Sequence, residues 1–488
     1  MSINNIPSSQ RDIERYVNNL YFRDRSHQRY ILHVGPTNSG KTYKALQAFD
    51  QDKSGCYLSP LRLLAYEVFE GLNEQGYDCS LITGEEKIIR PNASFLSATV
   101  EMCPTEHFST MIIDECSKLN DEYRGEKWLR AILTNNADEV HLILNEESQY
   151  LVEELLRQLA VSYEVETHER KGVLLPSPER QSMYNLPAQS VLVCFSRKIV
   201  HELKEKLEEL GRRVSIIYGD LPPDVKKYEM KRFIDGETEI CVSTDAIGMG
   251  LNLPCEQVIF YQVKKHDGKE FRTLTPFEAK QIAGRAGRYG QYEIGYFSAI
   301  RPKDEITLRQ LVADKKFILQ HTYMGIDFHI LEMMEGYDLD QKLENYDRLP
   351  LVPDGLKHII LPQSITKYDD NYYEKLEEFD LEVAFAFLCS PVKGNNEEYY
   401  IDAILDLYQN DAIYPPEKVY INRPIKKSDM QRLENYLSEV DLYVSMSNNA
   451  TLSKYIDFDE SVLEERKMYN EAIIRYLSRK RRRRNMRF

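Results

Sequence analysis

Short apolar runs alternate with amphipathic stretches through the first third of the chain. An apolar run of about four to eight residues bounded by turn-forming residues is typical of a strand buried on both faces. Such strands, separated by helices, form a parallel sheet with helices on its faces. The pattern predicts an α/β lobe over residues 28–166, after an amino-terminal extension over residues 1–27. Its expected strands are Tyr30–Val34, Gly55–Leu58, Ser94–Leu96, Met111–Ile113 and Val140–Leu144.

The same rhythm restarts after a polar, proline-containing stretch. Residues 167–188 contain Pro176, Pro178 and Pro187, which indicates a linker between two domains. A second α/β lobe is predicted over residues 189–302, with a helix over Lys198–Leu210. Its expected strands are Ser190–Phe195, Val214–Tyr218, Glu239–Ser243, Gln257–Val263 and Gly295–Ser298.

Beyond residue 302 the pattern changes to segments rich in leucine, glutamate and tyrosine. A mainly helical domain is predicted over residues 303–478, followed by a basic tail over residues 479–488. The expected helical segments are Phe317–Gln320, Tyr372–Cys389, Asp402–Tyr408 and Val462–Lys480. The predicted fold class is α/β, with two tandem parallel-sheet lobes followed by a mainly helical carboxy-terminal domain.

Length and composition are those of a multidomain globular protein. The chain has 488 residues, of which 42% are hydrophobic and 29% charged, and this length exceeds what one hydrophobic core supports. No apolar run approaches the roughly 20 residues that span a bilayer, so no membrane partner is expected. Residues 1–20 have no apolar signal core, and Asp12 and Glu14 argue against a transit peptide. The expectation is a cytoplasmic protein.

Charge is distributed unevenly along the chain. The net charge of −15 does not favour binding of a polyanion, which would need a locally positive channel or backbone amides. The basic tail is either a solvated segment or a contact for nucleic-acid phosphates, and both interpretations stay open. Its basic residues are Arg479, Lys480, Arg481, Arg482, Arg483, Arg484 and Arg487. The eight cysteines form no CxxC pair and have no paired histidines nearby, so they predict neither a zinc site nor a disulfide framework.

The first strand is followed by a phosphate-loop pattern, in which two glycines four residues apart precede a lysine and a threonine. Glycines let backbone amides curl around a phosphate, and the following helix presents the positive end of its dipole. Lys41 is expected to reach the β- and γ-phosphate oxygens of ATP, and the Thr42 hydroxyl to bind Mg²⁺. The expected nucleotide-binding residues are Gly35, Pro36, Thr37, Asn38, Ser39, Gly40, Lys41 and Thr42.

An apolar strand that ends in two acids supplies the second half of an ATPase site. In Ile112-Ile113-Asp114-Glu115, we expect Asp114 to hold Mg²⁺ and Glu115 to polarise the attacking water. An Asp-Glu pair after an apolar run is common on protein surfaces. It indicates an ATPase site here because a phosphate loop stands upstream of it.

The second lobe carries Gln281-Ile-Ala-Gly-Arg285-Ala-Gly-Arg288. Arginines three apart on a helix point the same way, so Arg285 and Arg288 can both approach one γ-phosphate, with Gln281 one turn earlier. An arginine delivered across a cleft accelerates phosphoryl transfer by about 10³–10⁵. Upstream, Ser243–Asn252 contains small and hydroxylated residues that suit close approach of a sugar-phosphate backbone and, at Gly250 and Asn252, of nucleotide.

Together these segments resemble superfamily 2 DExH-type helicases. The residues of these motifs are more similar still to those of the mitochondrial degradosome RNA helicases and their bacterial relatives. This resemblance covers residues 28–300, and its motifs are highly specific. The remaining segments that carry the likeness are Thr99–Met102, Tyr218-Gly219, Leu221–Pro223 and Thr244–Leu253. The resemblance implies two RecA-like lobes and ATP-dependent, 3′ to 5′ translocation along single-stranded RNA with duplex unwinding. It also implies RNA turnover together with an exoribonuclease.

Residue roles follow from the resemblance position by position. Lys41, Asp114, Glu115, Gln281, Arg285 and Arg288 would be catalytic, with Arg288 as the main arginine finger. The RNA path would be lined by Ser59, Pro60, Arg62, Thr83, Gly84, Thr99, Phe195, Ser196 and Thr244. Ser117 stands where this branch usually has glutamine, a residue that helps couple hydrolysis to strand contacts, so coupling could be looser here.

Three alternatives stay open at this point. The chain is either a processive RNA helicase, an ATP-gated RNA clamp with weak unwinding, or a DNA translocase, because none of the motor motifs reads a base. The oligomeric state is not predicted.

Asp267-Gly268 between two strand-like runs within Tyr261–Phe271 predicts a hairpin. We expect this hairpin to touch the fork of a duplex, the other interpretation being an ordinary hairpin at the lobe edge.

Overall fold

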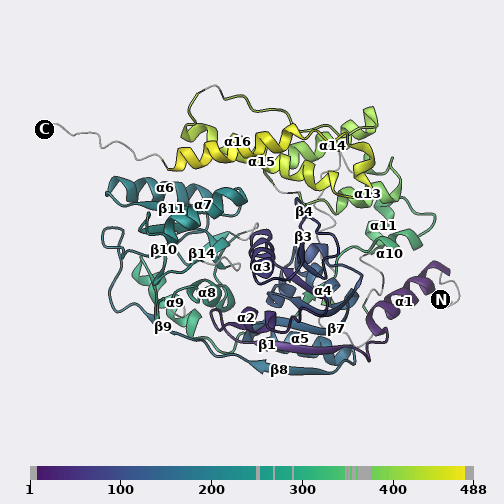
Figure 1. Ribbon diagram of the computed structural model, residues 1–488, viewed down its shortest axis with the longest axis horizontal. Helices are drawn as coiled ribbons and strands as arrows, with labels where there is room; N and C mark the ends of the chain where they lie inside the picture. The colour runs from purple at the N-terminus through teal and green to yellow at the C-terminus, as the bar shows by residue number, and fades with distance from the viewer. Residues whose placement is uncertain are drawn as a thin grey trace.

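The computed structural model describes most of the chain. The described residues are 8–248, 253–266, 270–287, 291–346, 349, 352–353, 359–360, 375–392, 394–421 and 423–478. They form two α/β lobes and a mainly helical domain that lies across both lobes (Figure 1). The predicted fold class is confirmed.

The first lobe is built on an eight-stranded sheet in the order β4-β3-β5-β2-β6-β7-β1-β8. Every pair is parallel except β3 with β4, and strands such as β2 are buried at each position, as their apolar sequence requires. All five strands expected here are present. The strands are β1 (Arg29–Val34), β2 (Gly55–Ser59), β3 (Cys79–Ile82), β4 (Lys87–Ile88), β5 (Phe95–Thr99), β6 (His107–Ile113), β7 (Asn136–Leu144) and β8 (Tyr163–Thr167).

Five helices pack around this sheet: α1 (Ser8–Phe22), α2 (Lys41–Leu46), α3 (Arg62–Glu74), α4 (Gly125–Thr134) and α5 (Glu146–Gln158). Helix α1 falls within the predicted amino-terminal extension, and this prediction needs correction. Ile13, Val17 and Tyr21 recur every four residues, and all three are buried in the core of the lobe. The segment is therefore a packed helix.

The second lobe has a six-stranded parallel sheet in the order β11-β12-β10-β13-β16-β9. Strand β9 lies within residues 167–188, so the prediction of a linker over this whole range is wrong. Its apolar residues pair with β16 at the sheet edge, where Pro176 is tolerated because an edge strand has no second ladder to complete. The strands are β9 (Val173–Pro176), β10 (Ser190–Val193), β11 (Val214–Ile217), β12 (Ile240–Ser243), β13 (Gln257–Phe260) and β16 (Ile294–Ala299).

Helices and a hairpin complete this lobe: α6 (Arg197–Glu209), α7 (Pro223–Ile234), α8 (Pro276–Ala283) and α9 (Pro302–Ala313), with β14 (Lys264–His266) and β15 (Phe271–Thr273). Strands β14 and β15 pair antiparallel, as the hairpin prediction requires, and the Asp267-Gly268 turn lies outside the described residues.

The helical domain begins after α9 and returns to the first lobe before crossing to the second. The predicted helix at Phe317–Gln320 is wrong: this segment has no regular secondary structure, and the Leu319 N–H donates to the Glu147 carbonyl of the first lobe. Its elements are β17 (Thr322–Tyr323), α10 (Phe328–Met333), α11 (Leu339–Tyr346), β18 (Ile359–Ile360), α13 (Leu381–Leu388), α14 (Glu397–Asn410), α15 (Lys427–Ser447) and α16 (Ser461–Leu477).

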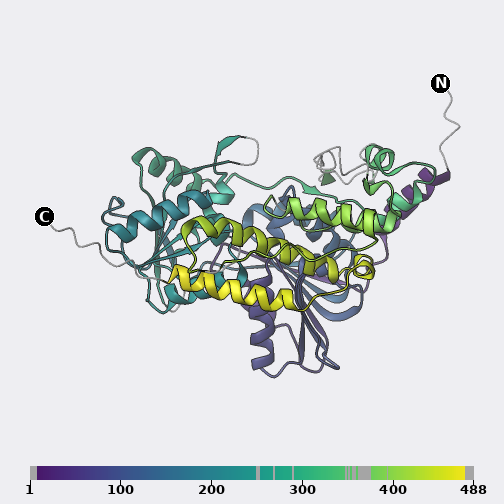
Figure 2. The ribbon, with the colours of Figure 1, turned by 90° about the horizontal axis from the view of Figure 1, so that it is seen from above.

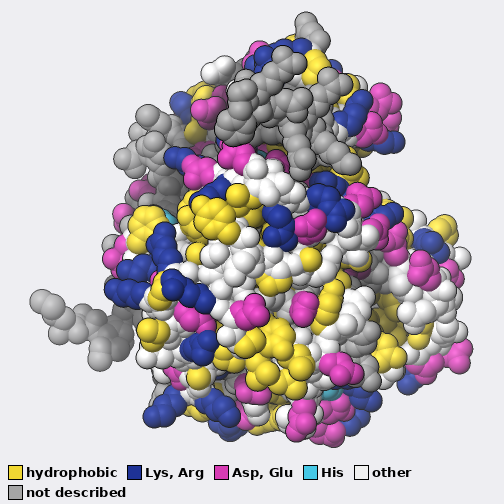
Figure 3. Space-filling model, turned by 90° about the vertical axis from the view of Figure 1, so that its left-hand side faces the viewer, with side chains coloured by type: hydrophobic (Ala, Val, Ile, Leu, Met, Phe, Trp, Pro, Cys, Tyr) yellow, Lys and Arg dark blue, Asp and Glu magenta, His cyan; other side chains and the backbone are white. Residues whose placement is uncertain are grey.

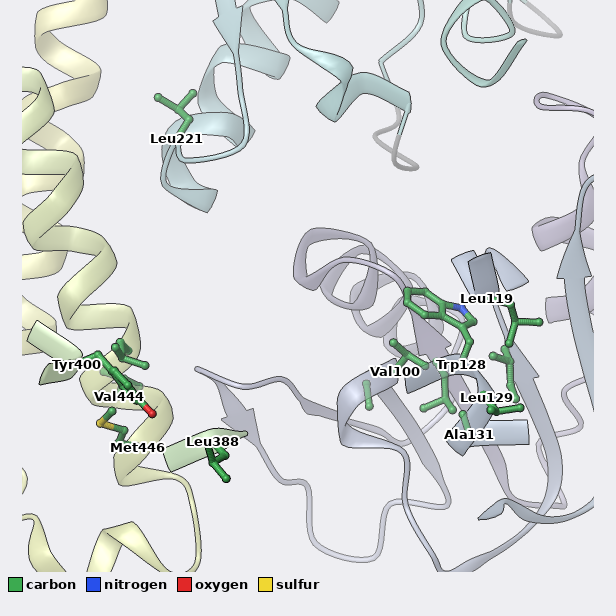
Figure 4. Packing of buried hydrophobic residues seen from close by; sticks show 14 of the residues in the cluster. Val100, Leu119, Trp128, Leu129, Ala131, Leu221, Leu388, Tyr400, Val444 and Met446 are labelled. Carbon is green, nitrogen blue, oxygen red and sulfur yellow. The ribbon is translucent and has the colours of Figure 1, made fainter. Parts of the chain in front are cut away.

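Buried apolar side chains connect the helical domain to the lobes. Figure 4 shows Trp128 with Val100 and Leu129 in the first lobe, and Tyr400 with Val444 in the helical domain; all belong to one cluster of buried residues. Figure 2 shows α15 and α16 side by side over both lobes. Among the described residues, none of the helices combines the length and the apolar character that a bilayer crossing demands.

Candidate functional site

The phosphate-loop residues form a tight turn between β1 and α2. Asn38 and Gly40 take left-handed backbone conformations, with φ of 63° and 83°. The Lys41 ammonium folds into the loop and donates to the carbonyls of Gly35 at 2.6 Å and Pro36 at 2.7 Å. Burial lowers the pKa of Lys41. The lysine is thus held at the mouth of the loop by backbone acceptors that an anion can replace.

Gly35 at the start of this loop has no room for a side chain. A Cβ atom built there would lie 2.2 Å from the His168 carbonyl oxygen. We expect Gly35→Ala to lower the free energy of unfolding by about 1–3 kcal/mol, because overpacking forces the backbone apart. Urea unfolding measures this. Gly71→Ala in α3 is the control, since nothing lies within 4 Å of its Cβ position; equal losses in both variants would contradict the explanation.

Asp114 ends β6 and faces the phosphate loop. Its carboxylate accepts hydrogen bonds from the hydroxyls of Thr42 at 3.2 Å and Tyr57 at 2.7 Å, and from the Glu115 N–H at 2.7 Å. Burial, and then the charge of Glu115, raises the pKa of Asp114 to about 6. Ser117 is buried and donates to the Glu115 carboxylate at 3.1 Å. The two acids and the threonine form one polar cluster, as their positions in the sequence led us to expect.

Removing the Asp114 charge should stabilise the chain in the absence of Mg²⁺. The pKa of the carboxyl rises from 3.8 to about 6 on folding, so stability is lost as pH rises across this window and stays lost above it. We expect Asp114→Asn to raise the free energy of unfolding by roughly 1–3 kcal/mol at pH 8 and by less at pH 5. The amide keeps the bond from the Glu115 N–H, and the Tyr57 hydroxyl can turn to accept.

Urea unfolding in EDTA at both pH values measures this effect. Asp138→Asn serves as the control, because Asp138 is exposed and pairs with His107 on the same sheet. A gain that is equal at pH 8 and pH 5 would rule out the burial of charge as its cause.

Residues of the second lobe close the other side of the same cleft. The cleft measures about 410 Å³ and is lined by Lys41, Asp114, Glu115, Gln281 and Arg285. The Arg285 guanidinium donates to the Gly248 carbonyl at 2.8 Å and lies 3.8 Å from the Glu115 carboxylate. Among the described residues, Gln281 Nε2 and Arg285 Nε are buried and have no hydrogen-bond partner. These donors fit an anionic ligand in the cleft.

Contacts beside the cleft fix the lobes against each other, and the sequence did not reveal them. The Asn38 amide donates to the carbonyls of Gly284 at 3.0 Å and Gly287 at 2.7 Å. The Arg170 guanidinium donates to Thr37 at 2.9 Å in one lobe and to Gly284 at 2.8 Å in the other. Asparagine in the loop and arginine in the linker are individually unremarkable residue types, so only the fold gives them this role.

Three of the expected nucleotide-site residues, Gly250, Asn252 and Arg288, lie outside the described residues. Their roles stay predictions.

The expected RNA-path residues of the first lobe lie at or just after the carboxyl ends of β2, β3 and β5. Four of them, Ser59, Pro60, Thr83 and Thr99, are buried. Arg62 forms ion pairs with Glu85 and, at 3.6 Å, with Asp441 of α15. Arg466 of α16 joins the same two acids, at 2.8 Å each. A Cβ at Gly84 would lie 3.8 Å from Ser445 of α15. The helical domain therefore covers this part of the expected path.

The expected residues of the second lobe lie at the ends of β10 and β12. Phe195 and Ser196 line a depression of about 480 Å³ together with His266 and Phe271 of the hairpin. Phe271 is 71% exposed. Thr244 is half-buried, and its hydroxyl accepts from the Ala246 N–H at 3.4 Å. The hairpin is thus next to the expected path, which the sequence order alone did not establish.

Comparisons with known proteins address the family directly. Residues 18–168 match the family described as the DEXQ-box helicase domain of Suv3, and residues 178–290 match the helicase conserved C-terminal domain. An Arabidopsis thaliana protein, the DExH-box ATP-dependent RNA helicase DExH16, mitochondrial, is 34% identical over 86% of this chain and 76% of its own length. The chain belongs to the Suv3-type DExH helicase family of superfamily 2. The predicted membership is confirmed, and the helicase domains make the chain an ATP-hydrolysing enzyme that acts on nucleic acid.

Other relatives are longer than this chain. The Caenorhabditis elegans ATP-dependent RNA helicase SUV3 homolog is 41% identical over 61% of this chain and 42% of its own length. The Homo sapiens helicase SUPV3L1 is 38% identical over 60% of this chain and 39% of its own length. The prediction of a cytoplasmic location is wrong, because these relatives are named as mitochondrial proteins. That prediction rested on the composition of residues 1–20, which carries no weight on this point.

Proposed function

We propose that the chain is an ATP-dependent RNA helicase that moves 3′ to 5′ along single-stranded RNA and unwinds duplexes. The observation that carries this proposal is the composite cleft, in which Lys41 and Glu115 of one lobe face Gln281 and Arg285 of the other. Hydrolysis in a cleft shared by two lobes changes their contacts at each cycle, and such a change can move a bound strand.

The residues present fit ATP and Mg²⁺. In the proposed site, Lys41 exchanges its backbone acceptors for phosphate oxygens, and Gln281 and Arg285 give their unsatisfied donors to the γ-phosphate. Arg288, the main finger that the resemblance implies, lies outside the described residues, and its role stays a prediction. Thr42 and Asp114 would hold Mg²⁺, which neutralises developing charge on phosphate oxygens when bound. Glu115 would orient and deprotonate the attacking water.

RNA is proposed to lie between the two lobes and the helical domain. Figure 3 shows that the outer face of the second lobe mixes basic, acidic and apolar side chains, so this face does not present a uniform basic surface to a polyanion. Arg62, Arg197 and Arg466 are all directed at the junction with α15 and α16, where acids now neutralise them. Strand entry would exchange these acids for phosphates, and the released strand would pass to an exoribonuclease.

One observation favours a second candidate, an ATP-gated RNA clamp with weak unwinding. Ser117 occupies the position of the family's glutamine, and its hydroxyl bonds to Glu115 within the same lobe. We infer that this shorter side chain couples hydrolysis to lobe movement more loosely than glutamine would.

A strand-displacement assay tests the proposal and separates the candidates. RNA and DNA duplexes of matched sequence carry a single-stranded tail at either the 3′ or the 5′ end. We expect displacement of RNA with a 3′ tail, dependent on ATP and absent in Glu115→Gln. Displacement of DNA duplexes alone would indicate a DNA translocase, and ATP-dependent retention without displacement would indicate the clamp.

The β14–β15 hairpin is proposed to touch the duplex fork. Its exposed Phe271 packs edge-to-face on His266, with ring centroids 5.1 Å apart, and could stack on a terminal base pair. We expect a shortened hairpin to lower the unwinding rate several-fold while leaving RNA-stimulated ATP hydrolysis unchanged. Parallel displacement and phosphate-release assays measure both. Unchanged unwinding would leave the hairpin an ordinary lobe-edge element.

A further inference from the structure

Three histidines and two glutamates meet at the edge of the first sheet, behind the phosphate loop. They come from neighbouring strands: His33 from β1, His141 from β7 and Glu166 from β8, with His168 just after β8 and Glu139 on β7. No step of the proposed ATPase uses them. No sequence motif indicates the cluster, because these residues are far apart in the chain and only the strand order brings them together.

The ligand atoms of three of these residues are spaced as a metal ion requires. His33 Nδ1 lies 3.0 Å from His168 Nε2 and 3.5 Å from a Glu166 carboxylate oxygen, which is 3.9 Å from His168 Nε2. Nitrogen and oxygen ligands bind Zn²⁺ at about 2.0–2.2 Å in a tetrahedron, which puts them roughly 3.3–3.5 Å apart. The three observed separations bracket this value.

The other two residues orient the first ligand. His33 Nε2 lies 2.8 Å from His141 Nδ1, and His141 Nε2 lies 2.9 Å from the Glu139 carboxylate. Because Glu139 can only accept, it directs the hydrogen of His141 toward itself. His141 Nδ1 then accepts from His33 Nε2, and the lone pair of His33 Nδ1 points to His168 and Glu166. A ligating imidazole usually donates its other N–H to a carboxylate, a backbone carbonyl or water, and here His141 relays that bond to the Glu139 carboxylate.

One ligand of the cluster faces solvent. Glu166 is 45% exposed, so an ion can enter from solvent and keep a water as its fourth ligand.

We propose that His33 Nδ1, His168 Nε2 and Glu166 form a Zn²⁺ site that fastens β8 to β1 at the base of the phosphate loop. The His168 N–H already donates to the Val34 carbonyl at 2.7 Å, directly before Gly35. Two residues later, Arg170 contacts both lobes. The ion would fix the segment that leaves the first lobe at the point where it supports the ATP cleft.

Metal analysis of the full chain tests this site. The chain is purified without a polyhistidine tag, loaded with Zn²⁺ and dialysed against metal-free buffer. Its zinc content is then measured by inductively coupled plasma mass spectrometry. We expect about one zinc per chain, and a tetrahedral visible spectrum when Co²⁺ replaces zinc. His168→Ala and Glu166→Gln should each weaken Zn²⁺ binding at least tenfold, and His141→Asn by about 10–100-fold as an outer-shell change.

His107→Ala is the matched control, because it removes another histidine that pairs with an acid on the same sheet, and it should retain zinc. Added Zn²⁺ should raise the melting temperature only of the chains that keep the site. The melting transition of each variant without Zn²⁺ also shows that the variant folds. Three outcomes would overturn the proposal: no retained zinc, zinc retained equally by His168→Ala, or loss of zinc only in Asp114→Asn. The first would mean that the imidazoles form a metal-free hydrogen-bonded chain, and the last that zinc binds in the ATP cleft.

Discussion

Arg285→Ala is expected to lower the turnover number of RNA-stimulated ATP hydrolysis by about 10³–10⁵-fold, the range for loss of an arginine finger. Arg285 is the finger candidate that the structure describes, and its guanidinium lies 3.8 Å from Glu115 across the cleft. Burial lowers its pKa, since a charged guanidinium there has lost its water without a full set of protein partners. A γ-phosphate that gains charge during transfer would supply the missing partner, so the interaction is strongest in the transition state.

Phosphate release at saturating RNA and ATP measures the effect, and fluorescent nucleotide binding tests whether the cleft survives. Arg285→Lys keeps the charge but not the planar fork, and should recover only a small part of the loss. Arg309→Ala is the control, because Arg309 is half-exposed on α9 and pairs with Glu305. If Arg285→Ala hydrolyses ATP normally, Arg288 is the finger and Arg285 only holds the Gly248 carbonyl in place.

The sequence alone predicted the structure correctly where an apolar strand is directly followed by residues of a chemical motif. Strand β2 is buried at every position and β1 at every position except Arg29, because both faces of a parallel sheet are covered, so their largely apolar sequences identify them. The phosphate loop and Asp114-Glu115 sit at the carboxyl ends of such strands, and a parallel sheet brings those ends to one edge. The cluster of Thr42, Asp114 and Glu115 therefore followed from the strands alone.

What the sequence did not reveal depends on contacts between distant segments. The Phe317–Gln320 segment has a helical composition, but it forms no helix, and the Leu319 N–H bonds instead to the Glu147 carbonyl of the first lobe. Prolines indicated a linker at residues 167–188, although an edge strand tolerates them equally well. The covering of Arg62 by α15 and α16 arises from charges about 380 residues apart in the chain, as in the pairs Arg62–Asp441 and Glu85–Arg466. No local pattern encodes such pairs.

Glu115→Gln is expected to lower the turnover number by about 10²–10⁴-fold, the range for loss of a general base, while leaving ATP binding within a few-fold of the original. The Glu115 backbone is left-handed, with φ of 52°, and its carboxylate is held between Ser117 at 3.1 Å and Arg285 at 3.8 Å. These contacts direct it into the cleft. Glutamine has the same shape and keeps the bond from Ser117, but it cannot take a proton from water.

Single-turnover hydrolysis with excess enzyme separates this chemical step from product release. Glu153→Gln on α5 is the matched control, because its carboxylate accepts from Gln149 on the same helix and does not line the cleft. In the Glu115→Gln chain, ATP should stay bound because it is not hydrolysed, and the two lobes should stay closed around it. The chain should therefore retain RNA without displacing the complementary strand. Hydrolysis at the original rate would show that another group activates the water, and the assignment of Glu115 as the base would then be wrong. Ser117→Ala, which frees Glu115 on one side, should slow hydrolysis far less, because Arg285 still orients the carboxylate.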